Sequence, residues 1–241
     1  MKKYELTQNS IKINNRTLYQ IRTLKDFGSV KKGNLGGYIV SEKNLSHDGN
    51  CWVSGNAQVS ENARVYGNAE VYGKAQVSGN AQVSGNAWVY GKAQVSGNVR
   101  VSGNALVYEN ALVSENAMVS GNAQVDGKAQ VYGKAQVYGK ARVYGDTWVY
   151  GNASVYGNAQ VYGNARVSEN ARVSGNVHVY GNAQVSGNAR LRYIPIDFDC
   201  DFDPYKTLKE ILNCPEILPA LSGLNKNLDK LISTILTKTS T

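Results

Sequence analysis

Apolar and polar positions alternate along the chain with a period of six residues over residues 53–190. Valine recurs at every sixth position from Val53 to Val185, 23 times, without an insertion or a deletion. The unit reads Val-Ser/Tyr-Gly-Asn-Ala-x, in which only valine and alanine are regularly apolar. A short fixed period predicts a solenoid, because each unit can bury its apolar side chains only by stacking on its neighbours.

Each unit of six residues predicts one short strand and one corner. Counted from valine, positions five, six, one and two form the strand, in which alternation points alanine and valine inward. Gly holds position three in 19 of 23 units, and Asn holds position four in 17. We expect a tight turn there, because glycine adopts positive φ without cost and asparagine tolerates the left-handed region. Three six-residue sides close a coil of 18, so residues 18 apart stack on one face.

Three regions follow from this pattern. Residues 1–46 are predicted to form an N-terminal β cap that covers the open edge of the first coil. We expect strands at 4–6, 10–13 and 17–21, with a hairpin turn at 14–16. Residues 47–192 form the β-helix, in which His47 and Cys51 fall in its first, degenerate coil and Cys51 is expected in the core. Residues 193–241 predict a C-terminal strand and helices for capping or oligomerisation.

The last predicted helix carries an apolar stripe at i, i+3, i+4, i+7 and i+8. Such a stripe must bury itself, and residues 194–212 already supply a strand and a helix able to cover the last coil. We therefore predict a homo-oligomer, a dimer or a trimer, held together by this stripe. Its residues are Leu228, Leu231, Ile232, Ile235 and Leu236.

Sorting the outward residues by face gives the candidate binding residues. One face carries a column of tyrosines that only Asp126 interrupts, with Trp88 and Arg142 in the column beside it. The second face is mostly Gln and Ser, and the third is basic, with arginines at positions 64, 100, 172, 190 and 192. Lysines occupy all three corners of one coil, at positions 128, 134 and 140. The predicted ligand- or partner-binding residues are Tyr72, Tyr90, Tyr108, Tyr144, Tyr162, Tyr180, Trp88, Arg142, Lys128 and Lys140.

The tyrosine column has two interpretations that the sequence leaves open. Stacked tyrosines offer an amphipathic surface for proteins, sugars or nucleobases. Cross-strand aromatic ladders also stabilise a sheet without any ligand, by roughly 0.2–1 kcal/mol for each pair.

Composition indicates the class of ligand and the cellular compartment. The chain of 241 residues has a net charge of +8, which favours an anionic ligand such as a nucleotide or nucleic acid. Three cysteines without framework spacing favour a reducing compartment, and no apolar signal core or membrane-spanning run is present. We expect a cytoplasmic protein of a bacterial host that uses no cofactor, no metal and no membrane.

The repeat resembles the left-handed β-helix built from hexapeptides that many acyltransferases share, although Ser or Tyr here follows the valine. The stretch LKDFGSVKKGNLGGYIVSEKNLSHDGNCWVSGNA is similar to the start of YdcK-like proteins and of phage and prophage hexapeptide-repeat proteins. This resemblance implies an all-β solenoid, a single-stranded left-handed parallel β-helix, and a phage or prophage origin. Crossovers are normally right-handed, so the left hand rests on the resemblance alone, with a right-handed bactofilin-like helix as the alternative.

Catalysis is not predicted. No loop leaves the coils over residues 53–190, and the two histidines, His47 and His178, lack an obvious orienting carboxylate in the sequence. We predict a non-catalytic binding or scaffold protein that uses its tyrosine face. The alternatives are a self-assembling structural protein and a hexapeptide acyltransferase.

Overall fold

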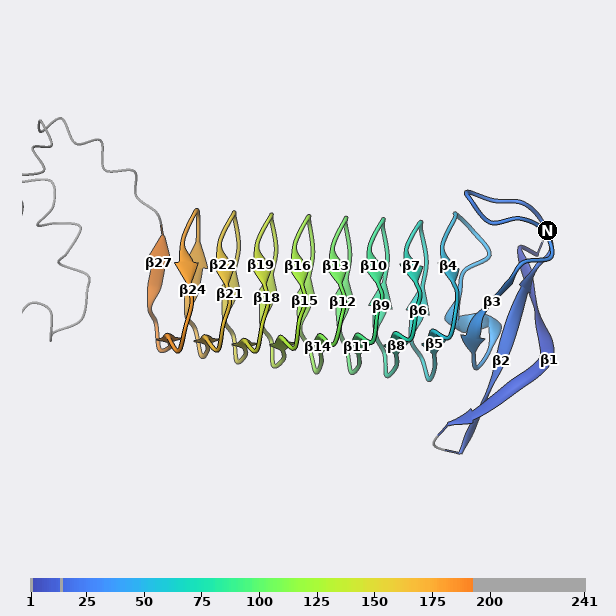
Figure 1. Cartoon of the computed structure of the whole chain (residues 1–241), viewed down its shortest axis with the longest axis horizontal. Coiled ribbons are helices and arrows are strands. Elements are labelled where there is room, and N and C mark those ends of the chain that lie inside the picture. The colour runs from blue at the N-terminus through green and yellow to red at the C-terminus, as the bar shows by residue number, and fades with distance from the viewer. Residues whose placement is uncertain (1, 14, 193–241) are drawn as a thin grey trace, which may run out of the picture. The chain divides into compact units, whose positions relative to one another are not determined.

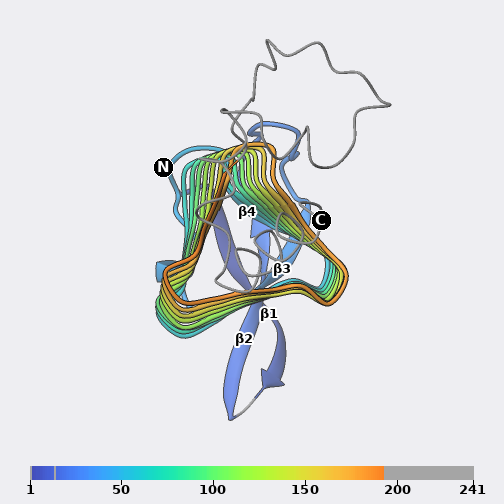
Figure 2. The ribbon, with the colours of Figure 1, turned by 90° about the vertical axis from the view of Figure 1, so that its left-hand side faces the viewer.

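Each six-residue unit places a short strand on one of three sides of a coil, and the coils stack into a parallel β-solenoid (Figures 1 and 2). The structure is a computed structural model that describes residues 2–13 and 15–192. The chain advances by 18 residues per coil, since Gln58 pairs with Gln76 and Gln76 with Gln94. The predicted parallel solenoid is confirmed, while its left-handed sense stays a prediction.

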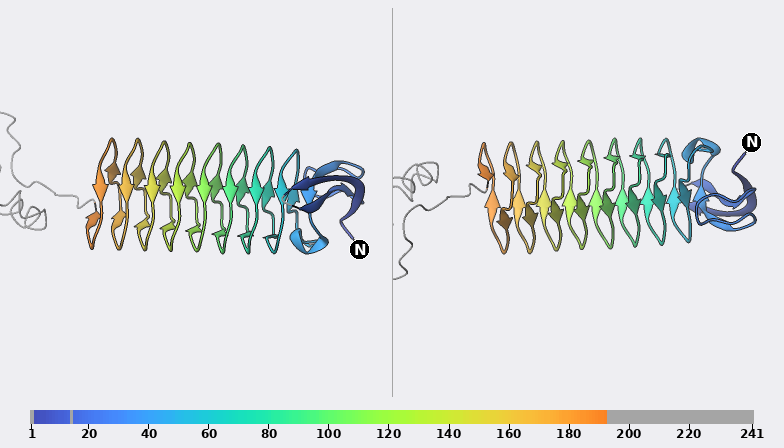
Figure 3. Two further views of the ribbon diagram at one scale, coloured as in Figure 1. Left: turned by 90° about the horizontal axis from the view of Figure 1, so that it is seen from below. Right: turned by 90° about the horizontal axis from the view of Figure 1, so that it is seen from above.

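The three faces are three sheets, visible as rows of arrows in Figure 3. The tyrosine face consists of β4 (Trp52–Val53), β7 (Glu70–Val71), β10 (Trp88–Val89), β13 (Leu106–Val107), β16 (Gln124–Val125), β19 (Arg142–Val143), β22 (Gln160–Val161) and β25 (His178–Val179). The arginine face consists of β6 (Arg64–Val65), β9 (Gln82–Val83), β12 (Arg100–Val101), β15 (Met118–Val119), β18 (Gln136–Val137), β21 (Ser154–Val155), β24 (Arg172–Ser174) and β27 (Arg190–Arg192).

The third sheet, the glutamine face, continues into the N-terminal cap. It consists of β1 (Tyr4–Ile13), β2 (Arg16–Thr23), β3 (Leu35–Ile39), β5 (Gln58–Val59), β8 (Gln76–Val77), β11 (Gln94–Val95), β14 (Leu112–Val113), β17 (Gln130–Val131), β20 (Trp148–Val149), β23 (Arg166–Val167) and β26 (Gln184–Val185). Strands β1 and β2 form an antiparallel hairpin, β2 pairs antiparallel with β3, and β3 pairs parallel with β5. The hairpin therefore extends the sheet beyond the first coil, as a cap over its edge requires.

Inward valine and alanine form a narrow core. The valines from Val53 to Val173 are buried, and so are Cys51 and nearly every inward alanine. The strands are shorter than predicted, two residues in most units rather than four. The hydrogen-bond ladder nevertheless runs through the corners: the N–H groups of Gln58, Ser60 and Asn62 donate to the carbonyls of the next coil at 2.9 Å.

The corners use glycine as predicted and asparagine differently. Corner glycines have φ of 62–81°, and Ala57 N–H donates to the Ser54 carbonyl across the turn at 3.3 Å. Positive φ falls only on the first central residue, the glycine, as in a type II′ turn. The following asparagines instead stack: Asn62 donates to Asn80, and Asn80 to Asn98, at 3.1 and 2.8 Å. The corner asparagines therefore make an amide ladder and do not adopt the left-handed conformation.

Two details of the cap differ from the prediction. The first two predicted strands are one strand, β1, with an irregular register between Leu6 and Ser10. Leu45 lies six residues before Cys51, where the regular period would pair it with Ala63, yet it pairs with Val65, beyond the 3-10 helix η1 (Glu42–Asn44). The intervening chain is two residues longer than a regular coil, so the period is broken before Cys51 and regular after it.

The N-terminal chain closes the core at this end. Lys3 is fully buried, and its ammonium donates to the carbonyls of Cys51 and Gly49 at 2.8 and 3.3 Å. Burial lowers the pKa of the Lys3 ammonium, and the Cys51 thiol beside it opposes that shift. The Tyr4 hydroxyl donates to the Leu45 carbonyl at 2.7 Å. These bonds satisfy carbonyls that the first coil would otherwise leave without partners.

Candidate functional site

The tyrosine face carries its predicted column as two stacks of parallel rings. Tyr72, Tyr90 and Tyr108 follow β7, β10 and β13, and their ring centroids are 4.8 and 4.9 Å apart with planes within 4°. Tyr144, Tyr162 and Tyr180 form the second stack, at 5.0 and 5.5 Å. The register of the sheet sets this spacing, because each ring is one coil from the next.

Stacking changes what this face can bind. Each inner tyrosine has both ring faces covered by its neighbours, so a nucleobase cannot lie flat upon it. The stacks present ring edges and hydroxyl groups outward, and ring faces only at their ends. Base stacking along the column, one of the predicted uses, is therefore restricted to the ends of the ladders.

Asp126 separates the two stacks. It is 9% exposed, and its Oδ2 has no hydrogen-bond partner among the described residues. Burial raises the pKa of the Tyr108 hydroxyl to about 12, with the Asp126 carboxylate as the second cause. A buried carboxylate oxygen without a partner is costly, so this position weakens the ladder.

The other predicted residues surround the stacks. Trp88 is 42% exposed and meets the edge of Tyr72 at 6.3 Å. The Arg142 guanidinium lies 5.4 Å from the Tyr144 ring centroid. The Lys128 Nζ lies 3.9 Å from Asp146 Oδ1 in the adjacent coil at one corner, and Lys140 is exposed at another corner.

Two further tyrosine pairs were missed in the sequence analysis. Tyr132 and Tyr150 stack at 5.1 Å on the glutamine face, and Tyr138 and Tyr156 at 4.9 Å on the arginine face. The spacing of 18 residues in the sequence predicts both pairs, each of which is only two rings long. Together with Tyr144 and Tyr162 they give every face a tyrosine pair over the same two coils.

Similarity to known repeats agrees with this geometry. The model of the YdcK beta solenoid repeat matches residues 57–73, 75–91, 93–109, 100–115, 135–151, 159–175 and 165–187. The chain is a YdcK-like repeat protein. Comparison with the curated proteins finds no match. The resemblance seen in the sequence is thus confirmed for the repeat, and the phage or prophage origin stays a prediction.

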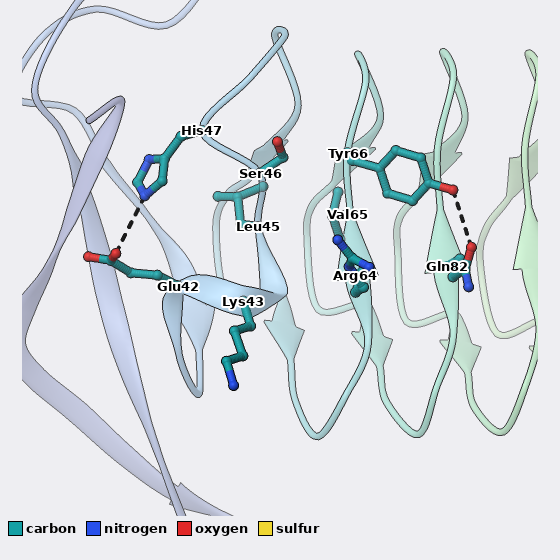
Figure 4. A pocket seen from close by; sticks show the side chains of 9 residues that line it. All are labelled: Glu42, Lys43, Leu45, Ser46, His47, Arg64, Val65, Tyr66 and Gln82. Carbon is teal, nitrogen blue, oxygen red and sulfur yellow. Dashed lines mark hydrogen bonds and ion pairs between the residues drawn. The ribbon is translucent and has the colours of Figure 1, made fainter. Parts of the chain in front are cut away.

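The YdcK-like coils meet the cap at a cavity of about 470 Å³ (Figure 4). Residues of η1 and the following turn, Glu42 and His47 among them, lie on one side, and Arg64, Tyr66 and Gln82 lie on the other. His47 has the orienting carboxylate that the sequence analysis did not find: its Nε2 lies 3.6 Å from Glu42 Oε2.

The contacts of His47 are those of a structural residue. Its Nδ1 accepts the Lys3 N–H at 3.2 Å, and its ring stacks on Tyr4 at 4.4 Å. Because Nδ1 accepts a hydrogen bond, the neutral ring carries its proton on Nε2, which is buried and has no hydrogen-bond partner among the described residues. The neutral ring therefore has no free lone pair with which to take a proton from a substrate. Lys2, at 2.6 Å, lowers the pKa of the Glu42 carboxyl, with His47 as a lesser cause.

His178 and the metal-ligating side chains of the described residues do not form a second site. His178 is exposed on the tyrosine face and meets the edge of Tyr162 at 6.2 Å. Over residues 2–13 and 15–192, no three His, Cys, Asp or Glu side chains gather as a metal site. Over those same residues, no helix has the length and apolar character needed to cross a membrane. The predicted oligomerisation stripe, Leu228 to Leu236, lies outside the described residues.

Proposed function

We propose that this YdcK-like protein is a non-catalytic scaffold whose tyrosine face binds a partner protein. The observation that carries the proposal is the preformed ladder of parallel rings that directly follow β7, β10 and β13, and again β19, β22 and β25. The left-handed coil, the phage or prophage origin and the homo-oligomer are further parts of this proposal, and they rest on the sequence.

The chemistry of the face suits a protein surface. Tyr, Trp and Arg are the residues that most often dominate protein interfaces, and here Trp88, Arg142 and six tyrosines share one sheet. Tyr180, at 62% exposed, and Trp88 are the most accessible of the aromatic side chains on this face. Because stacking already orders the rings, a partner has little side-chain entropy to remove when it binds.

Mixed charge around the ladder favours a protein over a uniform polyanion. Lys74 and Lys92 follow Tyr72 and Tyr90 at the corner, yet Glu109 follows Tyr108. A polyanion gains most from an unbroken basic stripe, whereas a protein can match both signs.

A photo-crosslinking amino acid at Tyr90, in cells that naturally make the protein, tests this proposal. We expect a defined adduct with one protein, and a weaker one when Tyr72 and Tyr108 are also changed to alanine. The matched control places the same crosslinker at Ser96, one side further along the same coil on the glutamine face. Equal adducts from both positions, or none from Tyr90, would refute a partner surface on the tyrosines.

The non-catalytic part of the proposal rests on the two histidines. The Nδ1 lone pair of His47 already accepts the Lys3 N–H, and His178 lies on an open face with no carboxylate at ion-pair distance among the described residues. We expect no turnover of acetyl-coenzyme A by the purified chain. Acyl transfer that the His178→Ala variant abolishes would contradict this.

A further inference from the structure

The short tyrosine ladder on the arginine face ends beside a cluster of arginines. Tyr138 and Tyr156 stack with their ring planes parallel, and the next residue in their column is Ser174. A serine side chain is too small to cover a phenol ring. The face of Tyr156 that points away from Tyr138 therefore has no ring against it in the next coil.

Three arginines surround Ser174. Arg172 precedes it by two residues on β24, and Arg190 is the strand partner of Arg172 on β27. Arg192 is the strand partner of Ser174 itself. Among the described residues none of these arginines lies within 4.0 Å of a carboxylate oxygen.

Such a cluster is unfavourable without an anion. Like charges directly opposite each other on adjacent strands repel, as Arg172 and Arg190 must. Guanidinium groups bind phosphate oxygens in pairs of parallel hydrogen bonds, so a phosphate group would relieve the repulsion.

A cavity already exists at this place. It has a volume of about 340 Å³ and is lined by Tyr156, Ser174, Leu191 and the three arginines. That volume is at the lower end of the range for small-molecule sites, roughly 300–1,000 Å³.

We propose that this cavity binds a nucleotide. The base takes the place of the missing ring above Ser174, stacked between the Tyr156 phenol and the Arg192 guanidinium. The phosphates lie on Arg172 and Arg190. The site belongs to the arginine face, so it is independent of the partner surface on the tyrosine face.

The glutamine face supplies a matched comparison within the same coils. There the pair Tyr132 and Tyr150 also ends at a serine, Ser168. Its surroundings differ: the Arg166 guanidinium lies 4.5 Å from the Trp148 ring centroid, and Gln184 and Ser186 stand where the arginine face has Arg190 and Arg192. The glutamine face thus lacks the arginine cluster, and its Ser168 is buried at 6% exposed whereas Ser174 is half-buried, so we expect it to bind no nucleotide.

Calorimetric titration of the full chain with ATP, inorganic tripolyphosphate and adenosine, at low salt, tests the site. ATP should bind more tightly than either fragment, and added salt should weaken it. Arg190→Ala should weaken ATP and tripolyphosphate alike, by about tenfold or more, since a charge-assisted hydrogen bond is lost. Tyr156→Ala should weaken ATP and leave tripolyphosphate unchanged, whereas Tyr150→Ala should change neither.

Filling the open place in the ladder with a tyrosine provides a second, independent test. Ser174→Tyr supplies the missing ring and should abolish the advantage of ATP over tripolyphosphate, while Ser168→Tyr on the glutamine face should not. A short single-stranded DNA with a 5′-phosphate offers the same base and phosphate chemistry as ATP. If this DNA bound more tightly than ATP and still required Tyr156 and Arg190, the nucleotide bound by the cavity would be the 5′ end of a strand. No ATP binding up to about 1 mM, or ATP binding that Ser174→Tyr leaves intact, would overturn the proposal.

Discussion

At the scale of single residues, a side chain's direction decides what substitutions do. Val119 is fully buried and packs in the core between the valines one coil before and one coil after it, Val101 and Val137. Ser120, its neighbour in the chain, points outward and is half-buried. Two adjacent positions therefore have opposite tolerance for charge.

The first prediction uses this pair. Val119→Asp places a carboxylate where no water or partner can reach it, and should lower the free energy of unfolding by several kcal/mol. Ser120→Asp should change it by less than about 0.5 kcal/mol. Thermal melts of the two variants decide; equal tolerance would mean that the inward and outward assignment is wrong.

Predictions for single residues were confirmed where the conformation depends on the six-residue unit itself. Alternation alone predicted buried Cys51 and the inward valines, and the need for positive φ predicted the corner glycines. The role of asparagine was wrong because its partner lies 18 residues away in the next coil. The four corner glutamates show the same limit: they adopt φ of 57–61°, and the Glu115 carboxylate accepts the N–H of Gly133, 18 residues on, at 3.1 Å. Interactions between coils are not visible from one unit of six.

At the scale of elements, the ladders on each face are the variable part of an otherwise uniform solenoid. Asn62, Asn80, Asn98 and Asn116 form a continuous amide ladder that ends at the coil carrying Lys134. The tyrosine column likewise stops at Asp126 and resumes at Tyr144. The sequence predicted which residues share a column. It did not predict that the rings cover each other's faces, because that depends on how the side chains pack.

The second prediction concerns the interruption at Asp126. Asp126→Tyr replaces an unpartnered carboxylate oxygen and joins the two stacks into one, which should raise the stability by about 1 kcal/mol or more. Ser102→Tyr is the control, because its column neighbours are Ser84 and Ser120 and a new ring there finds no partner. Chemical denaturation measures both. An Asp126→Tyr variant no more stable than the control variant would show that the carboxylate is satisfied in another way.

The third prediction is a loss of stability in alkali. Burial raises the pKa of six stacked tyrosines, Tyr72, Tyr90, Tyr108, Tyr132, Tyr138 and Tyr144, above the ordinary 10.0. The unfolded chain then holds fewer protons than the folded chain, so the free energy of unfolding should fall as the pH rises from 10.0 through about 12, the value for Tyr108.

Urea midpoints between pH 8 and pH 12 measure this fall, and the Tyr108→Phe variant should show a shallower one. A midpoint that stays constant across this range would mean that the hydroxyls ionise as readily in the folded chain as in the unfolded chain.

At the scale of the whole molecule, the two ends of the core differ in how completely their inward side chains are buried. The first end is closed by Lys3, Tyr4 and the β1–β2 hairpin. Toward the other end burial declines: Val185 is 9% exposed, and the inward Ala183 is exposed. The sequence predicted a cap before the first coil from its short strands, but the plugging role of Lys3 could not be predicted, because a lysine at the third residue has no apolar pattern to mark it.

The fourth prediction concerns assembly through the sequence that follows this end. Removing residues 224–241 deletes the predicted apolar stripe while leaving every described coil intact, so the β-solenoid should stay folded and a homo-oligomer should dissociate. Analytical ultracentrifugation reports the assembly, and circular dichroism reports the fold. A full-length monomer, or a truncated chain that remains associated, would rule out the stripe as the contact.

The strict register of 18 residues per coil has a consequence for how such a gene can change length. Deleting or duplicating one unit of six keeps valine and glycine in place but moves every later side chain together to a different face, which would split the tyrosine column at the point of the change. Only exchanges of three units at once preserve both the core and the surfaces. Recombination within this array therefore has two kinds of outcome. Steps of six yield a folded solenoid in which each column breaks and continues on another face, and steps of 18 yield a longer or shorter solenoid with unbroken columns.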